Sequence, residues 1–134
     1  MTIREWSEEL DAEFQKATAL RDMGDLIQAG AILERLSIEH PSVFGVWLVL
    51  GGVQMSQSNY EAAECSFSMA LALRPRSELA SLCMFHTLRH LGRVNDAFAE
   101  MRRFLILRPE SREYALLRQE LEGDDRATSE GRRT

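Results

Sequence analysis

The chain has 134 residues, of which 45% are hydrophobic and 28% charged, and its formal net charge is −5 at pH 7. This length suits one domain with a packed core, and the apolar content excludes disorder over most of the chain. An excess of 21 acidic over 16 basic residues disfavours a nucleic-acid binder, which normally carries a basic surface. The longest nearly apolar run, residues 43–53, is too short to span a membrane.

The N-terminal segment MTIREWSEEL is acidic and contains no apolar stretch of the kind that directs export. Thr2 and Glu5 form a capping box for a first helix, and Ser7 is an alternative N-cap. The two cysteines, Cys65 and Cys83, lack CxxC spacing and are typical of thiols in a reducing compartment. We therefore expect a cytoplasmic protein.

Three sets of positions recur every 34 residues along the chain, each with the same or a similar small or turn-forming residue. They are Pro41, Pro75 and Pro109; Ala29, Ala63 and Ala97; and Gly24, Ser58 and Gly92. Such a period is typical of a helix–turn–helix repeat. Each unit holds two stretches with helical apolar spacing, and each proline prevents the preceding helix from continuing.

The middle unit, residues 44–77, shows the repeat most completely. Its diagnostic residues are Trp47, Leu50, Gly51, Tyr60, Ala63, Phe67, Ala70 and Pro75. They fall on the signature of the tetratricopeptide repeat, a family that the sequence resembles over about residues 10–111. Gln54 and Ser58 depart from the signature, where an aromatic residue and a glycine are usual.

The outer units keep fewer signature residues. The first, residues 10–43, keeps Ala17, Leu20, Gly24, Ala29 and Pro41. It has Glu13 and Lys16 where the family has Trp and Leu. The third, residues 78–111, keeps Leu88, Gly92, Ala97 and Pro109. Its Phe85 replaces a small residue, which predicts locally altered helix packing.

The resemblance implies an all-α fold, a right-handed α-solenoid of three helix-turn-helix pairs over residues 10–43, 44–77 and 78–111. A C-terminal capping helix over about 111–122 closes this single domain, residues 1–122. Gly123 is predicted to end that helix, and residues 123–134 to form a disordered tail. Trp6 precedes the first unit and should dock, either on the first repeat or in a homodimer; the sequence does not choose between these.

In tetratricopeptide arrays the first helix of each pair lines a concave groove. The family's groove positions map onto Phe14, Thr18, Arg21, Gly45, Leu48, Val49, Gly52, Met55, Leu79, Leu82, Cys83, His86, Arg89 and His90. This surface is largely apolar, with Arg and His towards one end, and such patches tend to mark partner sites. The alternative is that some of these residues pack between repeats or under the N-terminal helix. The Lys/Arg/Asn clamp with which some family members hold an acidic C-terminus is absent, because its positions carry Phe14, Thr18, Val49, Leu79 and Cys83.

Metal binding and catalysis find little support in the sequence. Cys83, His86 and His90 share a helical face and are zinc-ligating residue types. However, Cys83 and His90 are separated by about 10 Å along a helix axis, which is too far for one ion. The chain has no nucleophile elbow, phosphate-binding loop or HExxH motif. We therefore expect no catalytic residues, no metal and no cofactor.

The resemblance implies a non-enzymatic protein that binds another protein through an extended or helical segment with apolar anchors. No nucleic acid and no membrane insertion are expected. The layout is similar to small bacterial chaperones of type III secretion. Alternatives are a scaffold subunit of a larger complex that uses a convex or edge surface, and a regulatory or immunity protein that binds a folded enzyme. Residues 74–111 carry seven bases and four acids, which is explained by a solvated face or by an acidic partner segment.

Overall fold

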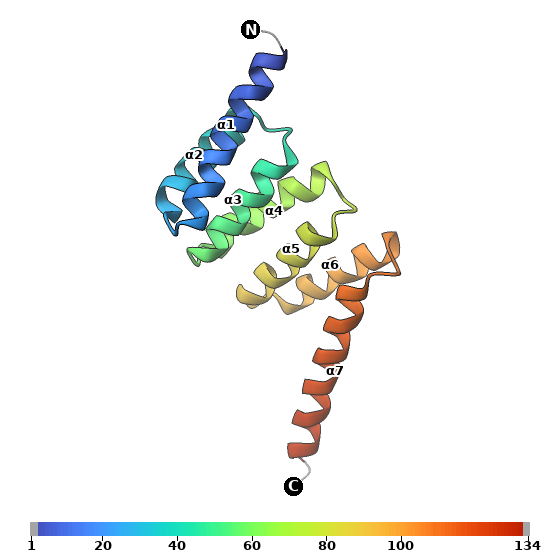
Figure 1. The fold of residues 1–134 in the computed structure, drawn as a ribbon. Coiled ribbons are helices and arrows are strands. Elements are labelled where there is room, and N and C mark those ends of the chain that lie inside the picture. The colour runs from blue at the N-terminus through green and yellow to red at the C-terminus, as the bar shows by residue number, and fades with distance from the viewer. Residues whose placement is uncertain (1–2, 133–134) are drawn as a thin grey trace.

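The computed structural model describes the backbone of residues 3–132 and the side chains of residues 8–122. The described backbone forms seven helices and no strand. These are α1 (Ile3–Asp22), α2 (Leu26–Glu39), α3 (Phe44–Ser56), α4 (Tyr60–Leu73), α5 (Glu78–His90), α6 (Val94–Leu107) and α7 (Arg112–Arg132). Helices pack in consecutive pairs, and each pair stacks on the next (Figure 1). The predicted all-α solenoid is confirmed. The alternatives for Trp6 concern a side chain outside the described residues.

The turn inside each pair has the same backbone form in all three units. Gly24 and Gly92 have positive φ values of 88° and 77°, and Ser58, at the equivalent position, has a φ of 59°. The residue after each turn donates its amide hydrogen five positions back, to Leu20, Gln54 or Leu88. A left-handed residue with this bond is a common way to end a helix. The same turn therefore recurs every 34 residues, in step with the sequence repeat.

The side chains packed between the two helices of a pair differ in size between the second and third units. Gly51 of α3 faces Phe67 of α4 so closely that an added Cβ would lie 2.5 Å from the Phe67 Cε1 atom. In the third unit the equivalent positions hold Phe85 and Met101, both buried in one core cluster. At these positions the third unit therefore carries its aromatic ring on the first helix of the pair, whereas the second unit carries it on the second helix.

A buried polar network joins α5, α6 and α7. The Ser81 hydroxyl donates to the Glu100 Oε2 atom at 2.6 Å. Because a serine hydroxyl has only one hydrogen, the Tyr114 hydroxyl, which is 2.6 Å from the Ser81 Oγ atom, must donate to it. Arg103 binds both carboxylate oxygens of Glu100, at 2.7 and 2.6 Å. Burial raises the pKa of Tyr114 above its ordinary range, which keeps the donor protonated.

Two helix ends bear on the sequence analysis. α1 begins at Ile3, where an N-cap at Thr2 places it, and Ser7, the alternative N-cap, lies inside the helix; Thr2 itself lies outside the described residues. α7 continues through Gly123 to Arg132, whereas composition predicts an end at Gly123 and a disordered tail over residues 123–134. A single internal glycine costs a helix about 1 kcal/mol relative to alanine, and no proline comes after it. In Figure 1, α7 leaves the array as a long single helix, with the termini at opposite ends.

Candidate functional site

The first helices of the three pairs form the inner face of the array. α1 contacts α3 and α3 contacts α5, whereas no comparable contact joins α2 to α4 or α4 to α6 within the described residues. Helices on the inside of a curved array approach one another more closely than those outside. All the groove residues named from the sequence lie on α1, α3 and α5, and none of them is fully buried.

An apolar row crosses this inner face at one position of each unit. Phe14, Leu48 and Leu82 are half-buried and lie on α1, α3 and α5 respectively. Leu48 and Leu82 pack against the core cluster of the second and third units, and Phe14 packs against that of the first. Phe14 also approaches α3 closely, since a Cβ added at Gly45 would lie 3.7 Å from the Phe14 Cζ atom. The three side chains of the row thus pack against the core on one side and remain partly exposed.

The groove residues beside this row divide into packed and open ones. Val49, Met55 and Cys83 are half-buried against the two core clusters, as the packing alternative expects. Leu79 differs from them because 59% of its surface is exposed. At Gly52 an added Cβ would meet nothing within 4 Å, so the space directly beside this glycine is open.

The end of the inner face near the turns is polar and basic. His86, Arg89 and His90 of α5 line a hollow of about 310 Å³. The His90 ring stacks on Tyr60 of α4, with ring centroids 4.6 Å apart and planes 1° from parallel. Burial, followed by the charges of Arg89 and His90, lowers the pKa of His86. A neutral His86 imidazole is therefore favoured near neutral pH.

Two further polar residues of this end, Arg21 and Thr18 of α1, interact within their own helix. Arg21 of α1 forms an ion pair with its neighbour Asp22, with the Arg21 Nη2 and Asp22 Oδ1 atoms 3.0 Å apart. Thr18 donates its hydroxyl hydrogen to the Gln15 carbonyl at 3.0 Å. Both side chains are thus engaged within α1, and the basic groups of α5 make the distinctive part of this end.

The cysteine and histidines of α5 do not gather into a metal site. Within the described residues, no three His, Cys, Asp or Glu side chains are placed to hold one ion. Cys83 is a free thiol, half-buried, and burial raises its pKa. A thiol with a raised pKa is a weak nucleophile at neutral pH, and Cys83 packs against the core cluster of the second and third units.

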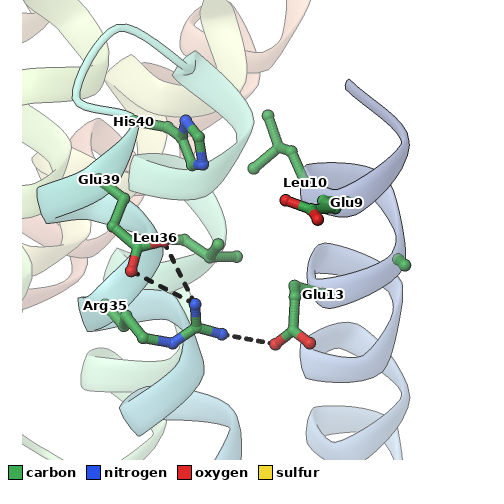
Figure 2. Close-up of a pocket in the computed structure, with 8 residues that line it drawn as sticks. Glu9, Leu10, Glu13, Arg35, Leu36, Glu39 and His40 are labelled. Atoms are coloured by element: carbon green, nitrogen blue, oxygen red, sulfur yellow. Dashed lines mark hydrogen bonds and ion pairs between the residues drawn. The ribbon is translucent and has the colours of Figure 1, made fainter. Parts of the chain in front are cut away.

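The sequence analysis missed a second hollow, of about 320 Å³, between α1 and α2. Arg35 reaches across from α2 to Glu13 and also binds Glu39 on its own helix (Figure 2). Glu13 stands where the family has Trp, so this departure was the signal in the sequence. A carboxylate paired with Arg35 stands here in place of the family's large ring.

Comparisons with known proteins agree on the architecture. No protein-family model and no curated relative matches the sequence. The type III secretion translocator chaperone SycD of Yersinia enterocolitica aligns with a TM-score of 0.74 and 14% identity, covering 95% of this chain and 96% of that one. A tetratricopeptide repeat protein from Parabacteroides merdae aligns with a TM-score of 0.73 and 22% identity, over 80% of this chain and 43% of that one. This chain has the tetratricopeptide-repeat fold.

A third structure of this fold carries a bound peptide. The second tetratricopeptide domain of Spaghetti (RPAP3), bound to the HSP90 peptide SRMEEVD, aligns with a TM-score of 0.67 and 17% identity, over 73% of this chain and 91% of that one. The tetratricopeptide array described here has neutral side chains at the positions of the family's ionic clamp. Within its described residues, no helix combines the length and hydropathy needed to cross a bilayer.

Proposed function

We propose that this tetratricopeptide array is a non-enzymatic binding module that holds an extended or helical segment of a partner protein against α1, α3 and α5. The observation that carries the proposal is the row of Phe14, Leu48 and Leu82. These apolar side chains stand at one position of all three units, on the inner face, and remain partly exposed. A ligand that covered them would remove apolar surface from water, which favours binding.

The outer helices also expose large apolar side chains, which are Ile27 and Ile38 on α2, Met69 and Leu73 on α4, and Val94, Ile106 and Leu107 on α6. However, no such position carries Leu, Ile, Met or Phe in all three units, whereas the inner row does. Single exposed apolar residues are normal on soluble proteins. The inner face is therefore the better docking surface, and a scaffold that uses the convex face is the weaker alternative.

The chemistry of the groove favours apolar anchors in the partner segment. Phe14, Thr18, Val49, Leu79 and Cys83 occupy the clamp positions and carry no charge at neutral pH. A secretion chaperone fits this surface, because keeping an apolar segment of a translocated protein from aggregating requires apolar contacts along an open groove. The similarity in shape to SycD, over nearly the whole length of both chains, supports this finer proposal of a bacterial, cytoplasmic chaperone.

The experiment is a three-way capture from an extract of the source cells, with circular dichroism confirming that each bait is folded. The groove bait carries Leu48→Asp and Leu82→Asp, and the matched control carries Ile38→Asp and Ile106→Asp. We expect the partner to be lost from the groove bait and kept by the wild type and the control. Leu79→Asp, at a 59% exposed position, is the second variant if the groove bait is unstable.

Cross-linking and mass spectrometry then identify which segment of the partner lies in the groove. A short apolar segment of a secreted subunit supports the chaperone proposal. Loss of the partner from the outer-face control alone would overturn the groove proposal in favour of a scaffold. Cross-links spread over the surface of a folded enzyme, together with its inhibition, would favour a regulatory or immunity protein.

A further inference from the structure

We propose that the basic end of the groove, formed by His86, Arg89 and His90, binds a carboxylate side chain of the partner segment whose apolar residues contact Leu48 and Leu82. This inference rests on the proposed function and adds a second specificity element to it. The ligand is thus a segment with apolar anchors and an Asp or Glu nearby.

The three basic residues continue the apolar row along α5. Leu82, His86 and Arg89 succeed one another at helical spacings of four and three residues, so they share one face of the helix. His86 is about 6 Å from Leu82 along the helix axis. The hollow that His86 lines with Arg89 and His90 is about 310 Å³, which is large enough for a carboxylate side chain. A segment anchored on Leu82 therefore has a basic hollow within reach of its neighbouring residues.

Arg89 has no acidic partner among the residues that the structure describes. The ion pairs of the described side chains involve Arg21, Arg35, Arg93, Arg103 and Arg108. The Arg89 guanidinium instead lies 5.9 Å from the centre of the Phe85 ring. Its position over a ring that is fully buried keeps it near the hollow. A carboxylate from a partner would satisfy donors that the chain itself leaves open.

The two histidines are held in place rather than free to turn away. Tyr60 stacks on His90 from the second unit, with 4.6 Å between ring centroids. The His86 ring meets Phe85 edge to face at 5.6 Å. Fixed donors lose less conformational entropy on binding than mobile ones, so the hollow is preorganised for an anion.

The surrounding elements supply little competing charge. α3, which contacts α5 on the inner face, has no ionisable residue at all. α4 carries Glu61 and Glu64 in addition to Tyr60, and Glu64 is engaged by Arg93 at 2.6 Å. On α6, Glu100 is engaged by Arg103 and Asp96 by Arg93. α3 is therefore an uncharged wall beside the basic hollow, and Glu61 is the one acid of α4 and α6 that no ion pair of the described residues engages.

Protonation gives the site a measurable signature. In the free protein, burial and then the charges of Arg89 and His90 lower the pKa of His86, and a bound carboxylate would raise the pKa of that imidazole. A group whose pKa rises on binding takes up a proton with the ligand. Affinity for an acidic segment should therefore increase as pH falls through the histidine range and decrease as pH rises.

The test uses a phage-displayed library of random dodecamer peptides, selected in parallel on four folded baits. These baits are the wild type, the triple variant His86→Gln/Arg89→Gln/His90→Gln, the charge-matched control Arg102→Gln on α6, and the groove bait Leu48→Asp/Leu82→Asp. We expect wild type and control to enrich peptides with apolar residues and an acidic residue at a fixed spacing. The triple variant should enrich the same apolar pattern without the acidic residue.

One enriched peptide and its Glu→Gln or Asp→Asn version are then compared by fluorescence anisotropy. The amide version should bind the wild type about fivefold more weakly, as expected for a partly exposed charge pair. This ratio should be larger at about pH 6 than at about pH 8, and the triple variant should bind both peptides equally.

The possible failures separate the two proposals. Enriched peptides with apolar residues but no acidic preference, or an acidic preference that the triple variant keeps, would overturn the carboxylate site and leave the groove intact. Enrichment that survives in the groove bait, or no enrichment on wild type, would count against the proposed function and the carboxylate site together.

Discussion

The second and third units build the same helix pair with opposite distributions of bulk. In the second unit the small Gly51 lies on α3 and the large Phe67 on α4, with an ideal Cβ at Gly51 only 2.5 Å from that ring. In the third unit the large Phe85 lies on α5 and the flexible Met101 on α6, both in the core. The turn geometry is the same in both. The same turn geometry therefore accommodates the aromatic ring on either helix of the pair.

The second and third units also differ in the contacts that stabilise them. The second has one buried side-chain hydrogen bond, from the Ser66 hydroxyl to the Gln54 Oε1 atom at 2.6 Å, and it packs between two neighbours. The third has helical repeat neighbours on one side only, and on the other Tyr114 of α7 bonds Ser81. The end unit therefore depends on the capping helix, whereas the middle unit is supported by other repeats.

The largest effect is expected from removing the buried ring of Phe85 in the third unit. Phe85→Ala should lower the free energy of unfolding by about 3–5 kcal/mol, since the ring is fully buried and its loss leaves a cavity. Adding Met101→Phe recreates the size order of the second unit and should recover at least about 1 kcal/mol. Urea denaturation of both variants measures this. A double variant no more stable than the single one would show that the two positions do not compensate.

A second prediction compares two adjacent glycines of α3. Gly51→Ala should lower the free energy of unfolding by about 1–3 kcal/mol, because the new methyl group overlaps the Phe67 ring. Gly52→Ala is the matched control, since its methyl group would meet nothing within 4 Å, and helix propensity favours alanine by up to about 1 kcal/mol. The two substitutions should move the thermal midpoint in opposite directions. Equal shifts would contradict the assigned contact.

A third prediction removes the link between α7 and the end unit. Tyr114→Phe should cost about 1 kcal/mol, because Ser81 keeps its bond to Glu100 but loses a donor. Burial raises the folded-state pKa of Tyr114 above its ordinary value of about 10. That stabilising contribution is complete below about pH 10 and is lost as pH rises above it.

Chemical denaturation between about pH 8 and about pH 11 tests the same residue by linkage. Wild type should lose more stability over this range than Tyr114→Phe, which has no phenol to ionise. Cys83 remains in both proteins, so its own titration cancels in the comparison. Parallel curves for the two proteins would refute the buried, protonated phenol.

The sequence predicts the fold because each unit carries the same turn and stop residues. Gly24 and Gly92 are needed where the backbone has positive φ, and the prolines mark each helix end, so period and boundaries can be read without contacts. The end of α7 could not be predicted in this way. Glycine lowers helix propensity at position 123 but does not forbid a helix there, and a single unfavourable residue is outweighed when its neighbours on both sides are helical.

The candidate site is only partly accessible from sequence. The resemblance to the tetratricopeptide repeat assigns Leu48, Leu82 and the basic residues of α5 to one face. Helix geometry alone places only Leu82, His86 and Arg89 along one side of α5. The stacking of Tyr60 on His90 joins different units, and no local pattern encodes it. The repeat signature suggests a core position for Trp47, but this residue is half-buried and donates its indole hydrogen to the Pro41 carbonyl at 2.8 Å, a contact set by loop geometry.

A smaller effect should appear at the turn inside the second helix pair, which lacks the glycine found in the first and third. Ser58 has a φ of 59°, a left-handed conformation that costs a residue with a side chain about 1–2 kcal/mol. Ser58→Gly should therefore raise the free energy of unfolding by about 1 kcal/mol, reduced by the greater freedom of glycine in the unfolded chain. Gly92→Ser is the reciprocal variant and should lower stability by a similar amount. Thermal unfolding of the pair checks whether the turns are equivalent.

The smallest net effect should come from removing the buried polar pair of the middle unit altogether. Ser66→Ala alone should cost about 1–3 kcal/mol, because it leaves the buried Gln54 amide oxygen without its donor. Gln54→Leu combined with Ser66→Ala should restore stability to near that of wild type, since replacing both partners by apolar groups leaves nothing unsatisfied. The first unit already has an apolar pair, Leu20 and Ile32, at these positions. Urea denaturation compares the two variants. A double variant as unstable as Ser66→Ala would show that an apolar pair cannot replace this hydrogen bond in the middle unit.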